Sequence, residues 1–379
     1  SAMLAAVGLV VGFCHLGLDM SLVRFLPPSG KDANPMINTV FTLSILLASL
    51  GALIFVVGLG IWSPALLFIR HNPIYIAAFI LFTIAFNVSS LIDRIFIAER
   101  RAGFVVTKSL IFSLLKLPLP ILLAGFFYSF GIFTSWGISL GVALLLSIFL
   151  FLPRVRPHYR FSFVISRKVI ADIMHFSFAN YVADLLWGVP TSVLPLMVVN
   201  LLGAEPSAYF YIAWAVGSAP GMISGAVSTS LFAEGSHDEE KLRLHIWRSL
   251  KMIGLILVPM VILIIAVADK ILLLFGGVYS ENATTLVRIM AISTLPLTIN
   301  LVYLAVKRVE KDLKVIIGLT AFPAPVMLGL AYFLLPRMGI NGAGVAWLTT
   351  QGIIALGVIA ISLRGGQIAS TVRTILSKK

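Results

Sequence analysis

Residues 106–128 read VTKSLIFSLLKLPLPILLAGFFY, and this stretch decides the fold class of the chain. It is almost continuously apolar and long enough to cross a bilayer as a helix of about 20 residues, whereas a barrel strand alternates over about ten residues. Similar stretches recur throughout the 379 residues, of which 59% are hydrophobic and only 11% charged. The sequence therefore predicts an all-α integral membrane protein and excludes a conventional water-soluble enzyme.

About eleven membrane spans are predicted between charged or Pro/Gly-containing breaks. They cover residues 2–25, 36–61, 73–98, 104–128, 134–152, 173–200, 208–232, 250–276, 284–306, 313–335 and 340–363. Lys and Arg residues concentrate in alternate connections between these spans. By the positive-inside rule, those connections and the C-terminus are expected on the cytoplasmic side of the cell membrane.

A weak internal repeat divides the spans into two groups. PLP at 118–120 recurs as PAP at 323–325, an offset of about 205 residues that predicts a duplicated unit of six spans. An even number of spans gives both copies one orientation, so we expect two six-helix lobes related by a parallel repeat. The offset would place the first helix of the first lobe before Ser1, so this helix is expected to be missing. The predicted divisions are an N-terminal lobe of about five spans at 1–153, a basic cytoplasmic connector at 154–172, a six-helix C-terminal lobe at 173–363 and a cytoplasmic tail at 364–379.

Ionisable side chains inside spans are costly, so they are the candidate site residues. Lys116 lies about twelve residues into its span, near the membrane midplane, where it would meet a substrate phosphate or form a structural ion pair. Asp184 lies at a similar depth in the other lobe, on one helix face with Asn180. We expect Lys116 and Asp184 to face a cavity, as a gate or a coupling-ion site. The alternative for Asp184 is a neutral carboxyl hydrogen-bonded to Asn180.

Five further polar residues are weaker candidates. Arg288 lies near the outer end of its span and either lines the cavity or reaches the interface. His15 and Asp19 are four residues apart and share a helix face, as a proton relay or a packing pair. Asn87 and Arg94 share a polar face of the span at 73–98, where Arg94 either receives a substrate head group or anchors the helix end.

Motifs for metal hydrolysis, thiolate metal binding and ATP binding are absent from the sequence. H-E-x-x-H, C-x-x-C and Walker A fail to match, and the G-x-S-x-G match, GISLG at 137–141, lies inside the apolar span at 134–152 rather than at the strand-to-helix turn that this motif needs. We therefore expect no enzyme activity, no cofactor and no metal site. The basic connector at 154–172 predicts contact with anionic membrane lipids rather than with nucleic acid.

Three stretches resemble a known group of transporters. They are GLDMSLVRFLP at 17–27, FSFANYVADLLWGVPTSVLPLMVVNLLGAEPSAYFYIAW at 176–214 and SLFAEGSHDEE at 230–240. They are similar to stretches of the multidrug/oligosaccharidyl-lipid/polysaccharide exporter superfamily, in its polysaccharide-biosynthesis, O-antigen-flippase-like branch. The resemblance implies two six-helix lobes around a central cavity, which rock to move a polyprenyl-phosphate-linked oligosaccharide across the membrane by alternating access. H⁺ or Na⁺ is the candidate coupling ion.

Two other functions are open at this point. An ion-coupled antiporter of drugs or other small cations would need an acidic, aromatic cavity, whereas Lys116 and Arg288 suit a phosphate better. A membrane glycosyltransferase or polysaccharide polymerase would need a sizeable catalytic loop with carboxylates, whereas the outer connections here are short. The sequence favours the flippase.

Overall fold

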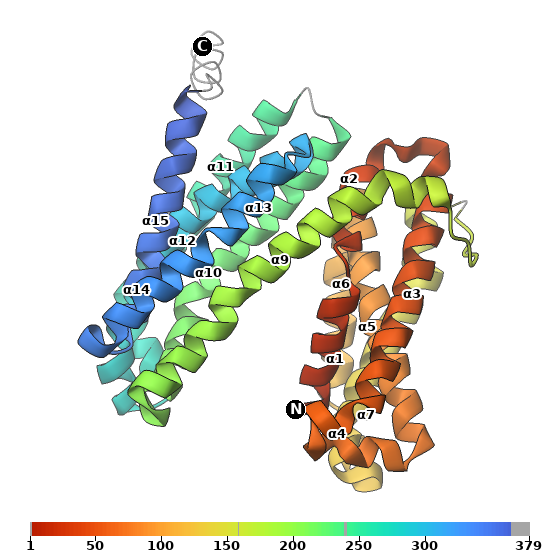
Figure 1. The fold of residues 1–379 in the computed structure, drawn as a ribbon, viewed down its shortest axis with the longest axis horizontal. Helices are drawn as coiled ribbons and strands as arrows, with labels where there is room; N and C mark the ends of the chain where they lie inside the picture. The colour runs from red at the N-terminus through yellow and green to blue at the C-terminus, as the bar shows by residue number, and fades with distance from the viewer. Residues whose placement is uncertain (1, 158, 239–240, 365–379) are drawn as a thin grey trace. The chain divides into compact units, whose positions relative to one another are not determined.

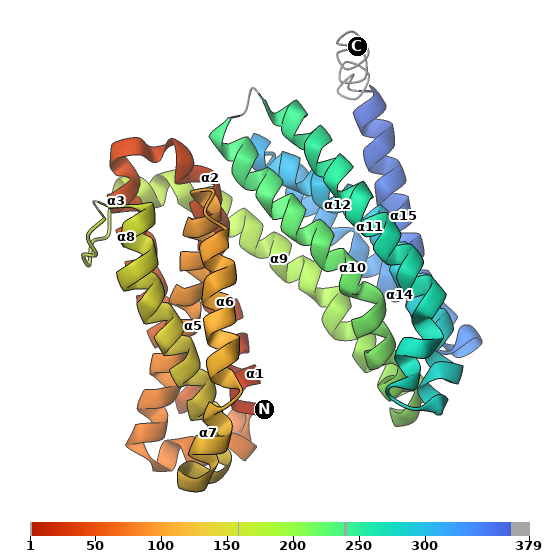
Figure 2. The same ribbon diagram turned by 180° about the vertical axis from the view of Figure 1, so that it is seen from behind.

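The computed structural model describes residues 2–157, 159–238 and 241–364, and these residues form helices without any strand. They confirm the all-α fold class. The chain forms two compact units, an N-terminal unit of Ser1–Tyr181 and a C-terminal unit of Val182–Lys379. In both units the helices run side by side (Figure 1; Figure 2). The predicted tail lies outside the described residues from position 365 onward.

The first part of the chain contains both short and long helices, up to and including the helix that crosses the unit boundary. They are α1 (Ala2–Cys14), α2 (Leu18–Phe25), η1 (Pro27–Asp32), α3 (Ala33–Val57), α4 (Leu59–Trp62), η2 (Pro64–His71), α5 (Pro73–Ala98), α6 (Gly103–Lys116), α7 (Leu119–Leu146), η3 (Ser147–Phe151), α8 (Leu152–Val155) and α9 (Arg167–Leu202).

The helices of the remaining chain are mostly long. They are α10 (Ala204–His237), α11 (Leu242–Leu273), α12 (Gly277–Glu310), α13 (Leu313–Ala321), α14 (Pro323–Met338) and α15 (Asn341–Arg364).

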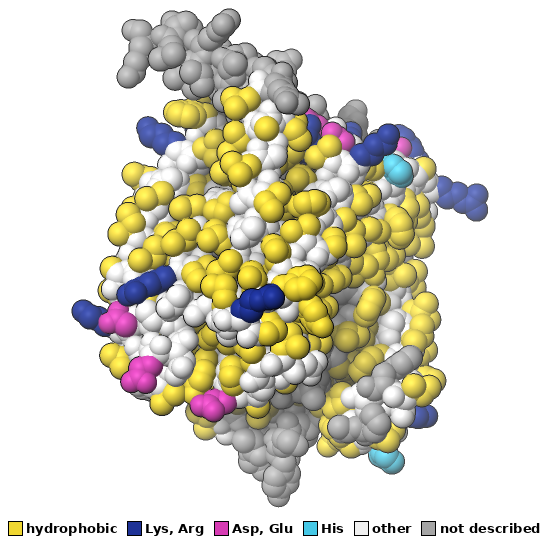
Figure 3. All heavy atoms as spheres, turned by 60° about the vertical axis from the view of Figure 1, so that its left-hand side comes forward, with side chains coloured by type: hydrophobic (Ala, Val, Ile, Leu, Met, Phe, Trp, Pro, Cys, Tyr) yellow, Lys and Arg dark blue, Asp and Glu magenta, His cyan; other side chains and the backbone are white. Residues whose placement is uncertain are grey.

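The structure places a helix at each of the predicted membrane spans. Ten helical stretches among the described residues are long and apolar enough to cross a bilayer, and an eleventh is the bent pair Met3–Cys14 and Leu18–Phe25. The stretch Gly103–Ile121 covers most of the span predicted at 104–128. Figure 3 shows hydrophobic side chains over most of one face of the molecule, as expected of a surface that faces lipid tails.

One helix forms the centre of each unit. In the N-terminal unit α5 packs against α1, α2, α3, α6 and α7. In the C-terminal unit α12 packs against α10, α11, α13 and α15. Leu91, Ile92, Ile95 and Phe96 of α5 are fully buried, and so are Leu286 and Val287 of α12. Because α5 and α12 are separated by about the predicted repeat offset, they are corresponding elements of a duplicated unit.

The first predicted span is broken rather than straight. Its two halves, α1 and α2, meet at 56°. Leu16 and Gly17 between them have φ angles of 46° and 68°, a left-handed conformation that ends an α-helix. Glycine adopts this conformation without the steric cost that a side chain adds. The break also frees backbone groups in the middle of a span, where neighbouring helices must cover them.

Helix α9 covers the break. A Cβ atom added to Gly17 would overlap the carbonyl oxygen of Ser177, so α9 approaches this backbone more closely than any other residue would permit. The hydroxyl groups of Ser21 and Ser177 lie 2.5 Å apart, and the rings of Phe25 and Phe176 meet edge to face at 5.5 Å. The first part of α9 therefore belongs to the N-terminal unit, whose boundary falls after Tyr181 rather than in the connector.

The connector before α9 is held to α3 by hydrogen bonds. Asn38 donates hydrogen bonds to the carbonyl oxygen of Arg160 and the hydroxyl of Ser162, at 3.0 and 2.9 Å. Tyr159 donates from its hydroxyl to Asn38 Oδ1 at 2.8 Å, and burial raises the pKa of Tyr159, so this donor stays protonated. Arg156 pairs with Glu99. These contacts fix where α9 starts.

Replacing Gly17 by alanine should lower the stability of the N-terminal unit. The left-handed conformation alone costs a non-glycine residue about 1–2 kcal/mol, and the overlap with Ser177 adds to that. The matched control is Gly12→Ala in α1, where an added Cβ meets nothing within 4 Å. Thermal unfolding in detergent should show a clear loss for Gly17→Ala and no loss for Gly12→Ala. Equal melting temperatures for the two variants would contradict the close packing of α9.

Candidate functional site

A buried chain of polar side chains lies beside the α1–α2 break. It begins at Asn87 of α5, which is fully buried. Asn87 Nδ2 donates to the carbonyl oxygen and the hydroxyl of Ser44 in α3, at 3.2 and 2.7 Å. The carbonyl oxygen can only accept, so these bonds fix the orientation of the amide. Asn87 Oδ1 then faces His15 Nδ1 at 2.9 Å.

The fixed amide determines the tautomer of His15. Asn87 Oδ1 is an acceptor, so His15 Nδ1 carries a hydrogen and donates to it. A neutral His15 therefore has its lone pair on Nε2. That nitrogen lies 3.4 Å from Asp19 Oδ1. In the neutral state two acceptors face each other, whereas a proton on Nε2 turns the contact into an ion pair.

Asp19 is the most deeply buried charged group of this chain of contacts. Its residue exposure is 4%, and Arg94 Nε lies 3.1 Å from Asp19 Oδ2. The other oxygen, Oδ1, is within ion-pair distance of His15, but no hydrogen bond reaches it from the described residues. A buried carboxylate is stable only with a compensating charge, which Arg94 supplies. The unfilled hydrogen-bonding capacity of Asp19 points toward His15.

A second ion pair lies next to Arg94 on the same helix, at Asp93. Lys108 of α6 donates to the carbonyl oxygen and hydroxyl of Ser89, at 3.0 and 2.7 Å, and to Asp93 Oδ2 at 2.6 Å. All three donors of the ammonium group are thus used. This pair ties α6 to α5 and has the saturated geometry of a structural contact.

The structure brings together two pairs of residues that the sequence predicts separately. His15, Asp19, Asn87 and Arg94 form one connected set, which we call the His15–Asp19 cluster together with Ser44. Ser44 was missed by the sequence analysis because a single serine in an apolar span gives no signal.

The other predicted residues lie elsewhere. Lys116 is exposed at the last position of α6, with Nζ 5.6 Å from the centre of the Phe112 ring. Arg288 is exposed on α12 and donates from Nε to the carbonyl oxygen of Ile265 in α11, at 3.1 Å. Both cations remain candidates for contact with a phosphate.

Asp184 has a partner that the sequence did not predict. Its Oδ1 lies 3.1 Å from Arg308 Nη2 of α12, and both residues belong to the C-terminal unit. Asn180 is buried in the N-terminal unit and donates to the carbonyl oxygen of Phe176 in its own helix, at 2.9 Å. Arg308 was missed because the sequence placed it with the basic residues of a cytoplasmic connection.

The chemistry that the His15–Asp19 cluster offers is reversible protonation. An imidazole can take up and release a proton, and the structure places the His15 ring beside the Asp19 carboxylate. In the part of the chain that the structure describes, no group of three or more His, Cys, Asp or Glu side chains could hold a metal ion.

Comparison with known proteins gives a family and a fold. A family model described as polysaccharide biosynthesis protein matches residues 2–284. No curated protein gives a match. Among solved structures, a mutant of the Vibrio cholerae MATE transporter VcmN has a TM-score of 0.73 at 16% identity, covering 97% of this chain and 88% of that one. The MATE transporter ClbM in complex with Rb⁺ has a TM-score of 0.72 at 15% identity, covering 95% and 85%.

A third solved structure is an outward-facing multidrug resistance MATE family transporter of the MOP superfamily. Its TM-score is 0.71 at 16% identity, and the match covers 98% of this chain and 88% of that one. At these identities the likeness establishes the fold.

Replacing Asn87 by alanine should destabilise the protein by about 1–3 kcal/mol, because His15 Nδ1 and Ser44 would lose a buried hydrogen-bond partner. The matched control is Asn282→Ala in α12, where the side chain is exposed and bonds to Val278 of its own helix. Chemical unfolding in detergent measures both variants. An Asn87→Ala protein as stable as the Asn282→Ala protein would show that the cluster is not bonded as described.

Proposed function

This chain belongs to the polysaccharide biosynthesis protein family, and from that premise we propose that it exports a polyprenyl-phosphate-linked oligosaccharide across the cytoplasmic membrane. The observation that carries the proposal is the match of the family over residues 2–284. The fold shared with MATE transporters supports alternating access as the mechanism. The chain performs no covalent chemistry in this process, and the substrate changes leaflet intact.

The substrate offers two kinds of chemistry to the protein, a charged phosphate and a neutral sugar. Lys116 is suited to the phosphate because its ammonium group carries three donors and is exposed on α6. Arg288, also exposed, offers a planar set of donors that matches phosphate oxygens. A cavity for a cationic drug would instead favour acidic residues, because carboxylates attract a cation whereas Lys116 and Arg288 repel it.

Transport against a gradient needs a coupling ion, and the His15–Asp19 cluster supports a proton. Arg94 already neutralises Asp19, so a metal cation would have to displace the guanidinium from the carboxylate. A proton needs no such displacement, because it binds His15 Nε2 and gains Asp19 Oδ1 as partner. One solved MATE transporter is in complex with Rb⁺. Na⁺ is accordingly the competing ion to test.

Other charged or titratable groups near His15 come from the helices packed around it. They are Cys14 of α1, Asp19 of α2, Asp93 and Arg94 of α5, Lys108 of α6 and Tyr181 of α9. Asp93 and Lys108 pair with each other. His15 is thus the group in this cluster that can accept a proton, at Nε2, and that has a partner for it, Asp19 Oδ1.

The proposal predicts that export by reconstituted protein depends on a proton gradient through His15. Proteoliposomes with an imposed pH gradient should flip lipid-linked oligosaccharide in the wild type. His15→Gln keeps a side-chain donor for Asn87 but has no titratable group, so it should lose gradient dependence and retain at most about a tenth of the rate. His175→Gln, at a histidine in α9 outside the cluster, is the control. Full coupling in His15→Gln, or coupling to Na⁺ alone, would refute the proton site.

Substrate class is tested at Lys116. Replacement by alanine should lower export of lipid-linked oligosaccharide about tenfold, the effect of losing one charge-assisted hydrogen bond. Lys116→Arg should keep most of the rate, because a phosphate accepts from either cation. Lys270→Ala, at an exposed lysine of α11, should have no effect. Gradient-driven transport of a cationic dye such as ethidium, without oligosaccharide export, would identify the protein as a drug antiporter instead.

A further inference from the structure

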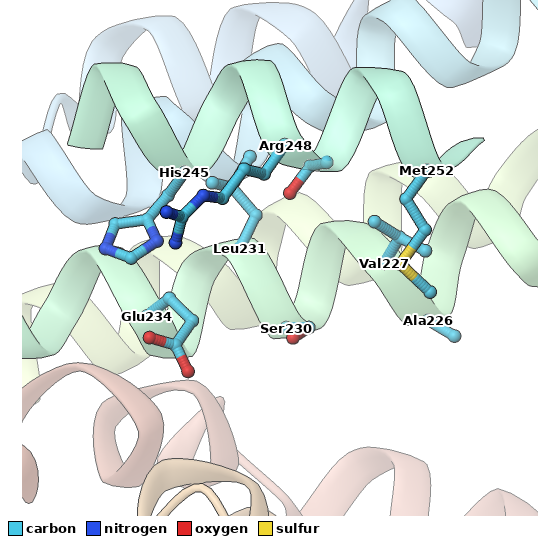
Figure 4. Close-up of a pocket in the computed structure, with 9 residues that line it drawn as sticks. Ala226, Val227, Ser230, Leu231, Glu234, His245, Arg248 and Met252 are labelled. Carbon is cyan, nitrogen blue, oxygen red and sulfur yellow. The ribbon is translucent and has the colours of Figure 1, made fainter. Parts of the chain in front are cut away.

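A pocket of about 470 Å³ lies between α10 and α11, within the C-terminal unit (Figure 4). It is outside the His15–Asp19 cluster, and export as proposed above does not use it. Its volume is in the range of small-molecule sites. Its walls are Ala226, Val227, Ser230, Leu231 and Glu234 of α10, and His245, Arg248, Ser249 and Met252 of α11.

The pocket changes character along its length. Its most polar residues, Glu234, His245 and Arg248, lie toward the connection that joins α10 to α11. Its apolar residues, Val227 and Met252, lie further from that connection. Met252 is seven residues beyond His245, or about 10 Å along the helix. A polar end beside a connection and an apolar end inside the span match an amphiphile with its head at the membrane surface.

The polar end offers hydrogen-bond donors. His245 and Arg248 extend side by side from α11 toward α10 in Figure 4. His245 Nε2 is buried and has no hydrogen-bond partner among the described residues. Arg248 carries the planar guanidinium group that recognises phosphate oxygens. Glu234 lines the opposite wall, and its carboxylate is directed away from these two side chains. The donors therefore face one place at the mouth of the pocket.

We propose that this pocket binds an anionic phospholipid of the bilayer, with the phosphodiester at His245 and Arg248 and an acyl chain along Val227 and Met252. The residues that line it include no Phe, Tyr or Trp and only two hydroxyl groups, from Ser230 and Ser249. An oligosaccharide needs many more hydrogen-bonding partners. A lipid head group needs few, so the bound molecule is a resident lipid rather than the transported substrate.

Neighbouring charges favour an anionic head group over a neutral one. Lys251 is exposed on α11 three residues beyond Arg248 and adds positive charge, whereas Lys241 forms an ion pair with Asp238 at 2.7 Å. Positively charged segments next to a span attract anionic lipids. The site is thus both selective, through His245 and Arg248, and located in a region where anionic lipids accumulate.

The test measures lipid that stays bound to purified full-length protein. The protein is reconstituted in bilayers of equal parts phosphatidylglycerol and phosphatidylcholine, extracted in mild detergent, and analysed by native mass spectrometry. The wild type should retain phosphatidylglycerol in preference to phosphatidylcholine. Arg248→Gln and His245→Leu should each weaken that retention about tenfold, while Lys251→Gln, which removes a charge from the same helix outside the pocket, should weaken it much less.

Three results would overturn the proposal. They are equal retention by all variants, equal loss in Lys251→Gln and Arg248→Gln, which would indicate a diffuse charge effect, and retention of lipid-linked oligosaccharide in preference to phosphatidylglycerol when it is added to the same bilayers. Circular dichroism and a single chromatographic peak establish that each variant is folded, and Arg248→Lys, which keeps the charge, should retain part of the binding. Because the readout is binding, a failure of oligosaccharide export leaves this result unaffected.

Discussion

The carboxylate of Asp19 is the group on which the arrangement of the N-terminal unit depends. Removing an ionised carboxylate from water costs several kcal/mol, and its partners must offset that cost. Arg94 comes from α5 and His15 from the break before α2, so both helices must be in place together. The break, in turn, needs a glycine at position 17 so that α9 can cover it. One buried charge thus specifies the packing of four helices.

The two units use an amide on the central helix in similar ways. In the N-terminal unit Asn87 of α5 joins α3 to the His15–Asp19 cluster. In the C-terminal unit Asn300 of α12 donates to the carbonyl oxygen and the side-chain oxygen of Gln351 in α15, at 3.1 and 2.8 Å. Both asparagines are buried. The partner helices differ, and only the N-terminal amide leads to a titratable group among the described residues. The duplicated units therefore share a scaffold but differ in the chemistry of its centre.

Much of the fold could be predicted from the sequence because hydrophobic length and basic asymmetry are local signals. Contacts between helices are not local signals, and these contacts determine which residues form the site. Periodicity placed His15 with Asp19 and Asn87 with Arg94, yet it could not show that these two faces meet. It did not find the partner of Asp184, since Arg308 lies 124 positions away. The break at Leu16 was missed because a single glycine in an apolar span is common, and only the approach of α9 makes Gly17 indispensable.

The contact between α2 and α9 also limits how early in synthesis the N-terminal unit can be completed. Ser21 and Ser177 are 156 residues apart in the chain. A ribosome adds about 5–20 residues per second, so α9 emerges about 8 to 30 seconds after the segment that it covers. During this interval the backbone at Gly17 and the hydroxyl of Ser21 face lipid or the insertion machinery without their final partner. The N-terminal unit therefore closes only when its last helix has been made.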